Sequence, residues 1–184
     1  MLSKYGPIFL NTHFNHPNEI TPESAAACDR LVRAGVPVNN QCVLMRGIND
    51  TVETQMKLGH GLLKSKVRPY YLFQCDEVQG TEHLHTPVET GIKIMEGLRG
   101  HTSGLAIPTY VIDLPFGGGK VPLQANYVVA QSEGELMLKN YQGRLFRFRN
   151  PSSSTTEMEL KTDGSLVADI NQNLEKVPVP VVRR

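Results

Sequence analysis

The sequence predicts an α/β protein with a mostly parallel sheet, followed by a small antiparallel β segment and a flexible tail. Apolar, strand-like runs alternate with helical stretches over residues 1–125, which is the pattern of βαβ units. Over residues 126–150, short strand-like runs are joined by hairpin signals instead. Residues 151–184 begin with a serine- and threonine-rich stretch and end in valine and proline, a composition typical of flexible segments.

The first strand and the first helix are indicated by local signals. The apolar run 7–12 is expected to form a strand. Thr21 is a candidate N-cap, Pro22 occupies the first helical position, and Glu23 places negative charge in the first turn. The helix should end at Gly35, since glycine is favoured where a helix ends.

The same alternation continues along the chain. Further strands are predicted at 38–45, 67–74 and 106–113, and further helices at 50–66 and 86–98. Because strands of βαβ units run parallel, the carboxyl ends of these strands should share one edge of the sheet. Three strands joined by hairpins are expected next, at 126–131, 135–139 and 144–149.

Composition excludes several classes of function. The net charge of +1 gives no electrostatic argument for binding nucleic acid or a membrane surface. No apolar run approaches the ~20 residues of a membrane span, and the first residues lack the apolar stretch of a signal peptide. Cys28, Cys42 and Cys75 are too widely spaced for a disulfide framework or a clustered metal motif. A cytoplasmic protein with reduced thiols is therefore expected.

Polar residues follow the predicted strands and favour a ligand site at their shared edge. They include His13 after the first strand, Gln41 in the second, Asp76 after the third and Asp113 in the fourth. Each has an ordinary structural alternative, since an isolated histidine is often structural and Gln41 could satisfy a buried backbone group. Their coincidence on four successive strands favours a site, because sites of α/β proteins form at that edge.

A glycine run, Gly117, Gly118 and Gly119, ends in Lys120 directly after the fourth predicted strand. Glycines allow the backbone to pass close to a flat or bulky ligand. A lysine at the end of such a loop is suited to a Schiff base with an aldehyde cofactor, or to a contact with phosphate. The alternative is a glycine hairpin that carries a solvated lysine.

Four segments carry a resemblance to a known family. They are residues 10–17, 68–76 and 97–104, and the glycine run that ends in Lys120. They resemble lysine 2,3-aminomutase, a radical S-adenosylmethionine enzyme, and the similarity extends from about Tyr5 to Pro151. The resemblance implies that residues 1–125 form the C-terminal half of a (β/α) barrel with a lysine loop for pyridoxal phosphate.

The resemblance also implies roles for individual residues. Lys120 matches the lysine that holds pyridoxal phosphate as an internal aldimine, next to the glycines of its loop. Asp76 and Asp113 match two carboxylates that bind the ammonium end of substrate lysine. His13 and Gln41 resemble residues near bound S-adenosylmethionine. The implied reaction is a radical 1,2-amino migration that interconverts L-lysine and L-β-lysine, started by a reduced [4Fe–4S] cluster.

The chain departs from the family at the cluster. The CxxxCxxC motif that holds the [4Fe–4S] cluster is absent, because the three cysteines are far apart in the sequence. We therefore expect a C-terminal half that is inactive alone, with the cluster ligands in a missing N-terminal half. A homo-oligomer, or association with such a half, is also expected.

Other functions stay open at this point. The chain could bind pyridoxal phosphate without catalysing the rearrangement, or serve as an interaction module that completes a barrel. Within the aminomutases, a relative that acts on a lysine attached to a translation factor is a further alternative to one that acts on free lysine.

Overall fold

The computed structural model describes residues 2–151. The chain divides into two compact units, the first ending at Asn126 and the second beginning at Tyr127. Each unit is described by itself below. The predicted flexible tail from residue 152 onward lies outside the described residues.

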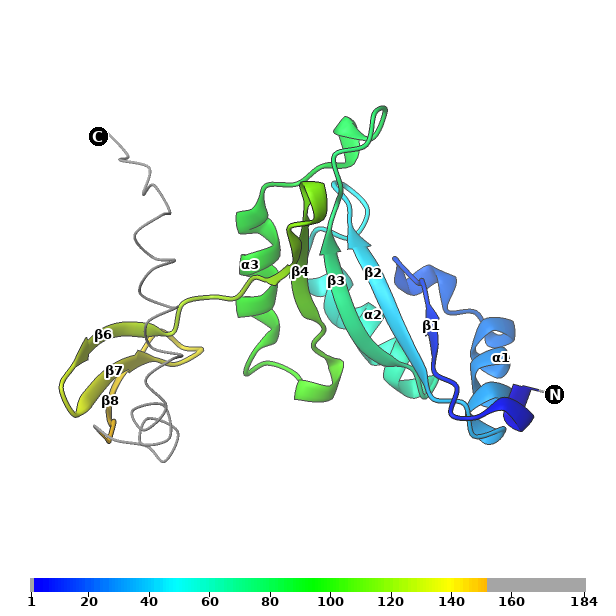
Figure 1. Ribbon diagram of the computed structural model, residues 1–184, viewed down its shortest axis with the longest axis horizontal. Helices are drawn as coiled ribbons and strands as arrows, with labels where there is room; N and C mark the ends of the chain where they lie inside the picture. Colours follow the sequence, from blue (N-terminus) through cyan, green and yellow to red (C-terminus); the bar gives the residue numbers. More distant parts are fainter. Residues whose placement is uncertain (1, 152–184) are drawn as a thin grey trace, which may run out of the picture. The chain divides into compact units, whose positions relative to one another are not determined.

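The first unit contains a five-stranded sheet with the order β1-β2-β3-β4-β5 (Figure 1). Its strands are β1 (Leu10–Thr12), β2 (Val38–Leu44), β3 (Arg68–Gln74), β4 (Thr109–Leu114) and β5 (Gly119–Pro122). The connecting α-helices are α1 (Pro22–Arg33), α2 (Val52–Lys64) and α3 (Val88–Leu98). Short 3-10 helices are η1 (Leu2–Tyr5), η2 (Pro17–Glu19), η3 (Glu82–Leu84), η4 (Gly104–Ala106) and η5 (Pro115–Gly117). The predicted alternation of strands and helices is confirmed.

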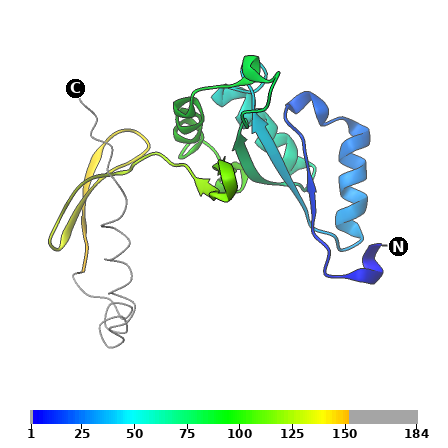
Figure 2. The same ribbon diagram turned by 45° about the horizontal axis from the view of Figure 1, so that its top comes forward.

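Strands β1 to β4 run parallel and lie in sequence order. Because each crossover of this kind is right-handed, consecutive helices fall on the same side of the sheet, and Figure 2 shows them following one another along it. The last strand differs from the others, since β5 returns antiparallel to β4.

The core lies between the sheet and these three helices. Each helix contributes buried side chains to one cluster, including Cys28 from α1, Leu58 from α2 and Ile94 from α3. They pack with Leu72 of β3 and Tyr110 of β4, which are adjacent across the sheet. Alternate residues of β2 are buried and half-buried. The half-buried side chains therefore point to the opposite side, which we call the open face. By strand register, its side chains include Gln41, Val43, Tyr71, Phe73 and Asp113.

Local signals place the helix ends close to where the sequence predicts them. Thr21 caps α1 by accepting a hydrogen bond from the Ser24 backbone N–H, and Ser24 in turn accepts one from the Thr21 backbone N–H. This reciprocal pair satisfies donors that would otherwise lack partners at the helix start. Thr51 caps α2 by accepting from the Thr54 backbone N–H. Gly35, just beyond α1, has a φ of +79°, which glycine adopts without steric cost.

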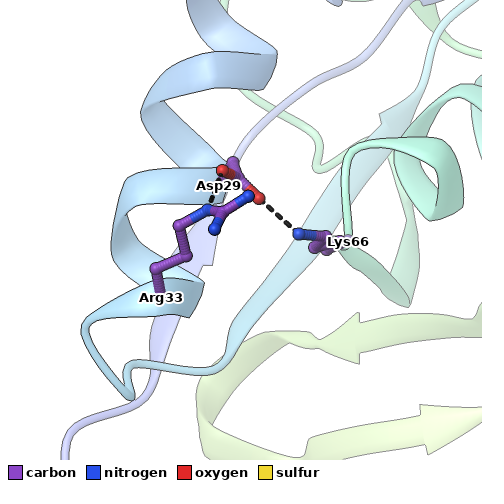
Figure 3. A network of polar contacts seen from close by, with 3 residues as sticks. All are labelled: Asp29, Arg33 and Lys66. Atoms are coloured by element: carbon purple, nitrogen blue, oxygen red, sulfur yellow. Dashed lines mark hydrogen bonds and ion pairs between the residues drawn. The ribbon is translucent and has the colours of Figure 1, made fainter.

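An ion network joins α1 to the turn before β3 (Figure 3). Asp29 accepts a hydrogen bond from Arg33 Nε at 2.5 Å, one helical turn away, and a second from the Lys66 ammonium group. These two cations lower the pKa of the Asp29 carboxyl, and the Lys66 hydrogen bond is the largest cause.

The second unit contains a three-stranded antiparallel sheet. Its strands are β6 (Val128–Ser132), β7 (Glu135–Lys139) and β8 (Leu145–Arg149), in the order β6-β7-β8. Gly134 and Gly143 lie in the two connecting turns with positive φ. The predicted hairpins are confirmed.

Candidate active site

Lys120 and Asp113 form the centre of the candidate site. They are directly opposite each other in the antiparallel pair of β5 and β4, so both side chains lie on the same face of the sheet. The Lys120 Nζ atom donates a hydrogen bond to Asp113 Oδ1 at 2.5 Å. About a third of the Lys120 side chain (34%) and 42% of Asp113 are exposed, so the pair is accessible to a ligand.

Two aromatic rings of β3 lie next to the same ammonium group. The Lys120 Nζ atom lies 4.2 Å from the ring centroid of Phe73 and 5.4 Å from that of Tyr71. Both distances are within the range of cation–π attraction. A hydrogen bond with Tyr70, burial and the charges of Tyr70 and Asp113 raise the pKa of the Tyr71 phenol above its ordinary value.

Sequence reasoning missed these rings as site residues. The signal that could have found them is the two-residue period of a strand, which puts Tyr71 and Phe73 on one face. Nothing in the sequence specifies that this face meets Lys120. That contact requires β5 to fold back antiparallel to β4. This fold-back brings Asp113 and Lys120 together although they are 7 residues apart in the sequence.

The glycine run forms a hairpin turn and not an extended loop. Residues 115–117 make the short helix η5, and Gly117 and Gly119 have φ values of +79° and +82°. A side chain at either position would strain the backbone. Lys120 follows this turn as the second residue of strand β5, so the backbone matches the glycine hairpin that the sequence offered as the alternative.

The remaining predicted residues lie on or beside the open face. Gln41 is half-buried and is the register partner of Tyr71. His13 directly follows β1, and Asp76 lies two residues beyond the end of β3. Both are exposed. Because β3 and β4 are parallel neighbours, Asp76 and Asp113 belong to the same edge of the sheet.

Other polar residues at strand ends serve the fold. Gln74 donates to the Thr86 carbonyl at 2.7 Å and accepts from the Tyr110 hydroxyl at 2.6 Å, on the helix side of the sheet. Asn49 is fully buried and donates to the carbonyls of Asn15 and Val43. The clustering of polar residues at this edge therefore reflects structural hydrogen bonds as well as a candidate site.

The cysteines do not fit an iron–sulfur cluster. Burial raises the pKa of the Cys42 thiol to about 12 and also raises that of Cys28, whereas a cluster requires thiolates. In the part of the chain that the structure describes, no group of three or more His, Cys, Asp or Glu residues could hold a metal ion. None of the helices described is long and apolar enough to cross a membrane.

In the described part of the chain, the side chains of the candidate site are partly exposed. A pocket of about 810 Å³ lies at the amino ends of β1, β2 and β3, where Asn11, Val38 and Arg68 are among its lining residues. None of the predicted site residues lines it. Its position is opposite to the edge at which α/β proteins place their sites, so we assign the chemistry to the Lys120 region.

Comparison with known proteins confirms the resemblance inferred from the motifs. Residues 95–182 match the family model described as lysine-2,3-aminomutase. The chain is 54% identical over 157 residues to the L-lysine 2,3-aminomutase of Fusobacterium nucleatum, covering 85% of this chain and 37% of that protein. It is 49% identical over 150 residues to the glutamate 2,3-aminomutase of Clostridioides difficile, covering 82% of this chain and 36% of that protein.

The chain thus spans little more than a third of the length of these relatives. A radical SAM methyltransferase from Sphaerobacter thermophilus has a TM-score of 0.48 and 20% identity with it, covering 61% of this chain and 36% of that one. This last likeness is too slight to bear on the fold. The sequence relatives are aminomutases, and they include enzymes named for both lysine and glutamate.

Proposed function

We propose that this chain is the cofactor- and substrate-binding part of a pyridoxal phosphate-dependent radical S-adenosylmethionine aminomutase that interconverts L-lysine and L-β-lysine. The observation that carries the proposal is the Lys120–Asp113 pair, which lies beside the aromatic rings of Phe73 and Tyr71 on the open face of the sheet. The similarity to aminomutases over most of the chain supports it.

The surroundings of Lys120 fit a cofactor with an aldehyde and a flat ring. Its amine is partly exposed, Phe73 and Tyr71 offer aromatic surface beside it, and the turn before it consists of glycines. Pyridoxal phosphate, when bound, supplies an aldehyde that condenses with amines and a ring that delocalises electrons. In this proposal Lys120 holds the cofactor, and Gly117, Gly118 and Gly119 let the backbone approach it.

The carboxylates Asp76 and Asp113 provide the argument for lysine as the substrate. Both belong to the edge that Lys120 faces, and a cationic side chain would gain charge-assisted hydrogen bonds from them. A glutamate side chain would instead meet like-charge repulsion. We propose that they bind the side-chain ammonium of lysine while the rest of the substrate reaches the cofactor.

His13 and Gln41 are proposed to contact S-adenosylmethionine, since His13 follows β1 and Gln41 lies in β2, which are neighbouring strands of the sheet. The [4Fe–4S] cluster has no candidate ligand set among Cys28, Cys42 and Cys75, so no step is assigned to these thiols. We propose that a polypeptide segment with the CxxxCxxC motif covers the open face, completing a (β/α) barrel and supplying the cluster.

Chemical trapping tests the cofactor assignment. The purified chain is incubated with pyridoxal phosphate, reduced with borohydride and mapped by peptide mass spectrometry. We expect a phosphopyridoxyl group on Lys120, and far less on Lys57, an exposed lysine that also pairs with a carboxylate. Equal labelling of both lysines would contradict a specific site.

Complementation tests the reaction. The 184-residue chain alone should form no β-lysine under anaerobic conditions with pyridoxal phosphate, S-adenosylmethionine and reductant. Adding the CxxxCxxC-containing part of a related aminomutase should restore activity, and Lys120→Ala should abolish it. Formation of β-lysine by the chain alone would refute the requirement for a second segment.

A non-catalytic role, in cofactor binding or barrel completion, is the second candidate function. The partly exposed open face favours it, because such a face can pack against another segment. If the chain only completes a barrel or only binds pyridoxal phosphate, the added segment should bind it without generating activity. Binding measured by size-exclusion chromatography, alongside the activity assay, separates the two functions.

A further inference from the structure

The contact between Lys120 and Asp113 has the chemistry of the substrate contact assigned to the same carboxylate. The Lys120 side chain ends in a primary ammonium group, as does the side chain of free lysine. It sits 2.5 Å from Asp113 Oδ1 and 4.2 Å from the centroid of Phe73. An ammonium group of this chain therefore already occupies the place at which a substrate ammonium would bind.

We infer that Lys120 competes with the side-chain ammonium of the substrate for Asp113, so that the unmodified chain blocks its own cation subsite. Asp113 becomes available to the substrate when the Lys120 amine has condensed with the cofactor aldehyde. This inference rests on the proposed function, because it takes Asp113 as part of the substrate site. It adds an order of binding, in which cofactor precedes substrate.

The competition favours Lys120 for two physical reasons. Lys120 is fixed opposite Asp113 by the strand register, so its ammonium is present at an effective concentration of millimolar order or higher. A free amino acid at lower concentration therefore competes poorly for Asp113. A second ammonium brought to the same carboxylate would also be repelled by the first, since like charges in one site disfavour each other.

Reaction with an aldehyde removes this competitor. The Lys120 ammonium first releases one proton to solvent. The neutral amine then forms a C=N bond with the aldehyde carbon, and the aldehyde oxygen leaves as water with the two remaining amine hydrogens. Because no free ammonium remains on Lys120, Asp113 loses its intramolecular partner and can accept a hydrogen bond from the substrate.

Ligand binding by the cofactor-free chain tests the inference directly. L-Lysine is titrated into the wild type, Lys120→Met, Lys120→Arg and the double variant Lys120→Met/Asp113→Asn, with binding followed by NMR chemical-shift changes. L-Norleucine, which has the same carbon chain but lacks the side-chain ammonium, is the matched control ligand. The Lys120 side chain is partly exposed on an edge strand, so these substitutions should leave the fold intact.

We expect Lys120→Met to bind L-lysine at least about 10-fold more tightly than the wild type, which corresponds to about 1.4 kcal/mol. Lys120→Arg should show no gain, because arginine keeps a cation at Asp113. The double variant should lose the gain, and L-norleucine should bind all four proteins alike. Lys120→Ala serves as a second neutral variant if circular dichroism shows that the methionine variant is unfolded.

Two results would overturn the inference. One is that Lys120→Met, or Lys120→Ala in its place, binds L-lysine with the same affinity as the wild type. The other is a gain that persists after Asp113→Asn, because Asp113 would then not be the subsite. Failure of the proposed function has a different signature, since it appears as absence of borohydride-trapped cofactor on Lys120 in the wild type.

Discussion

At the scale of single residues, the turn that presents Lys120 contains a strained residue. Phe116 has a φ of +57°, in the left-handed region that bulky side chains rarely adopt. Its side chain is fully exposed, with a relative exposure of 106%. The strain is therefore not offset by packing of the ring within the described residues.

Replacing Phe116 by glycine should stabilise the chain. Glycine adopts positive φ at little cost, whereas an L-residue in this conformation costs about 1–2 kcal/mol. The expected gain is about 1 kcal/mol in the free energy of unfolding, measured by urea denaturation. Phe116→Ala is the matched control, because it removes the ring but keeps the strain and should give little gain. Equal effects of both substitutions would show that the ring, and not the backbone, sets the stability.

At Gly91 of α3, close packing against Tyr110 leaves no room for a side chain. A Cβ atom placed there would lie 2.1 Å from Cζ of Tyr110, whose ring is buried between α3 and the sheet. Gly91→Ala should therefore lower the free energy of unfolding by about 1–3 kcal/mol, the usual range for overpacking. Gly104→Ala is the control, because a Cβ atom at that position would meet nothing within 4 Å. Similar stabilities of the two variants would contradict the packing argument.

At the scale of elements, the contact of α1 with the turn before β3 depends on one carboxylate. Asp29 joins Arg33 of its own helix to Lys66 beyond α2 (Figure 3). Such a bridge between elements distant in sequence stabilises the packing of α1 only while Asp29 is ionised.

This bridge should make stability depend on pH in the acid range. The pKa of Asp29 is lowered in the folded chain, so its contribution is present above the unfolded value of about 3.9. It is lost as pH falls through the lower folded value. Asp29→Asn should therefore reduce stability above about pH 4, and the difference from wild type should shrink below it. Thermal unfolding between neutral and acid pH measures the effect.

The Lys66→Gln variant serves as the background that separates the Asp29–Lys66 contact from effects of other carboxylates on the pH dependence of stability. With the Lys66 partner removed, Asp29→Asn should have a smaller effect on the same pH profile, because the largest cause of the lowered pKa is gone. An unchanged effect in this background would show that Lys66 does not contribute to the bridge.

At the scale of the whole molecule, the sheet of the first unit has strand edges without a partner and one partly exposed face. In the described chain β1 pairs only with β2, and β5 pairs only with β4, so both outer edges of the sheet lack a strand partner. The open face is also partly exposed along β2 and β3. Unpaired edges of this kind favour association with another chain.

We therefore expect the isolated chain to self-associate or to aggregate. Light scattering over a concentration series should give a mass above that of the 20.4 kDa monomer. Addition of the complementary CxxxCxxC segment should shift the material to a defined complex. A monodisperse monomer at all concentrations would count against the half-barrel interpretation.

The sequence by itself determined the features that depend on near neighbours. Thr21 and Pro22 specify the start of α1 through hydrogen bonds and dihedral angles within one helical turn. The alternation of apolar runs and helical stretches indicated a mostly parallel sheet, because βαβ units join strands that run in the same direction. The resemblance to aminomutases was likewise contained in contiguous motifs.

Only the tertiary structure decided which side chains meet. Strand β5 turns back on β4, and this brings Lys120 onto Asp113 and over Phe73. Gln74, which the sequence places beside the candidate site, points instead to the helices and bonds with Tyr110. The reason is physical: helix caps and strand periods arise from interactions a few residues apart. Contacts between strands depend on register and on packing between segments far apart in the chain, which no local pattern encodes.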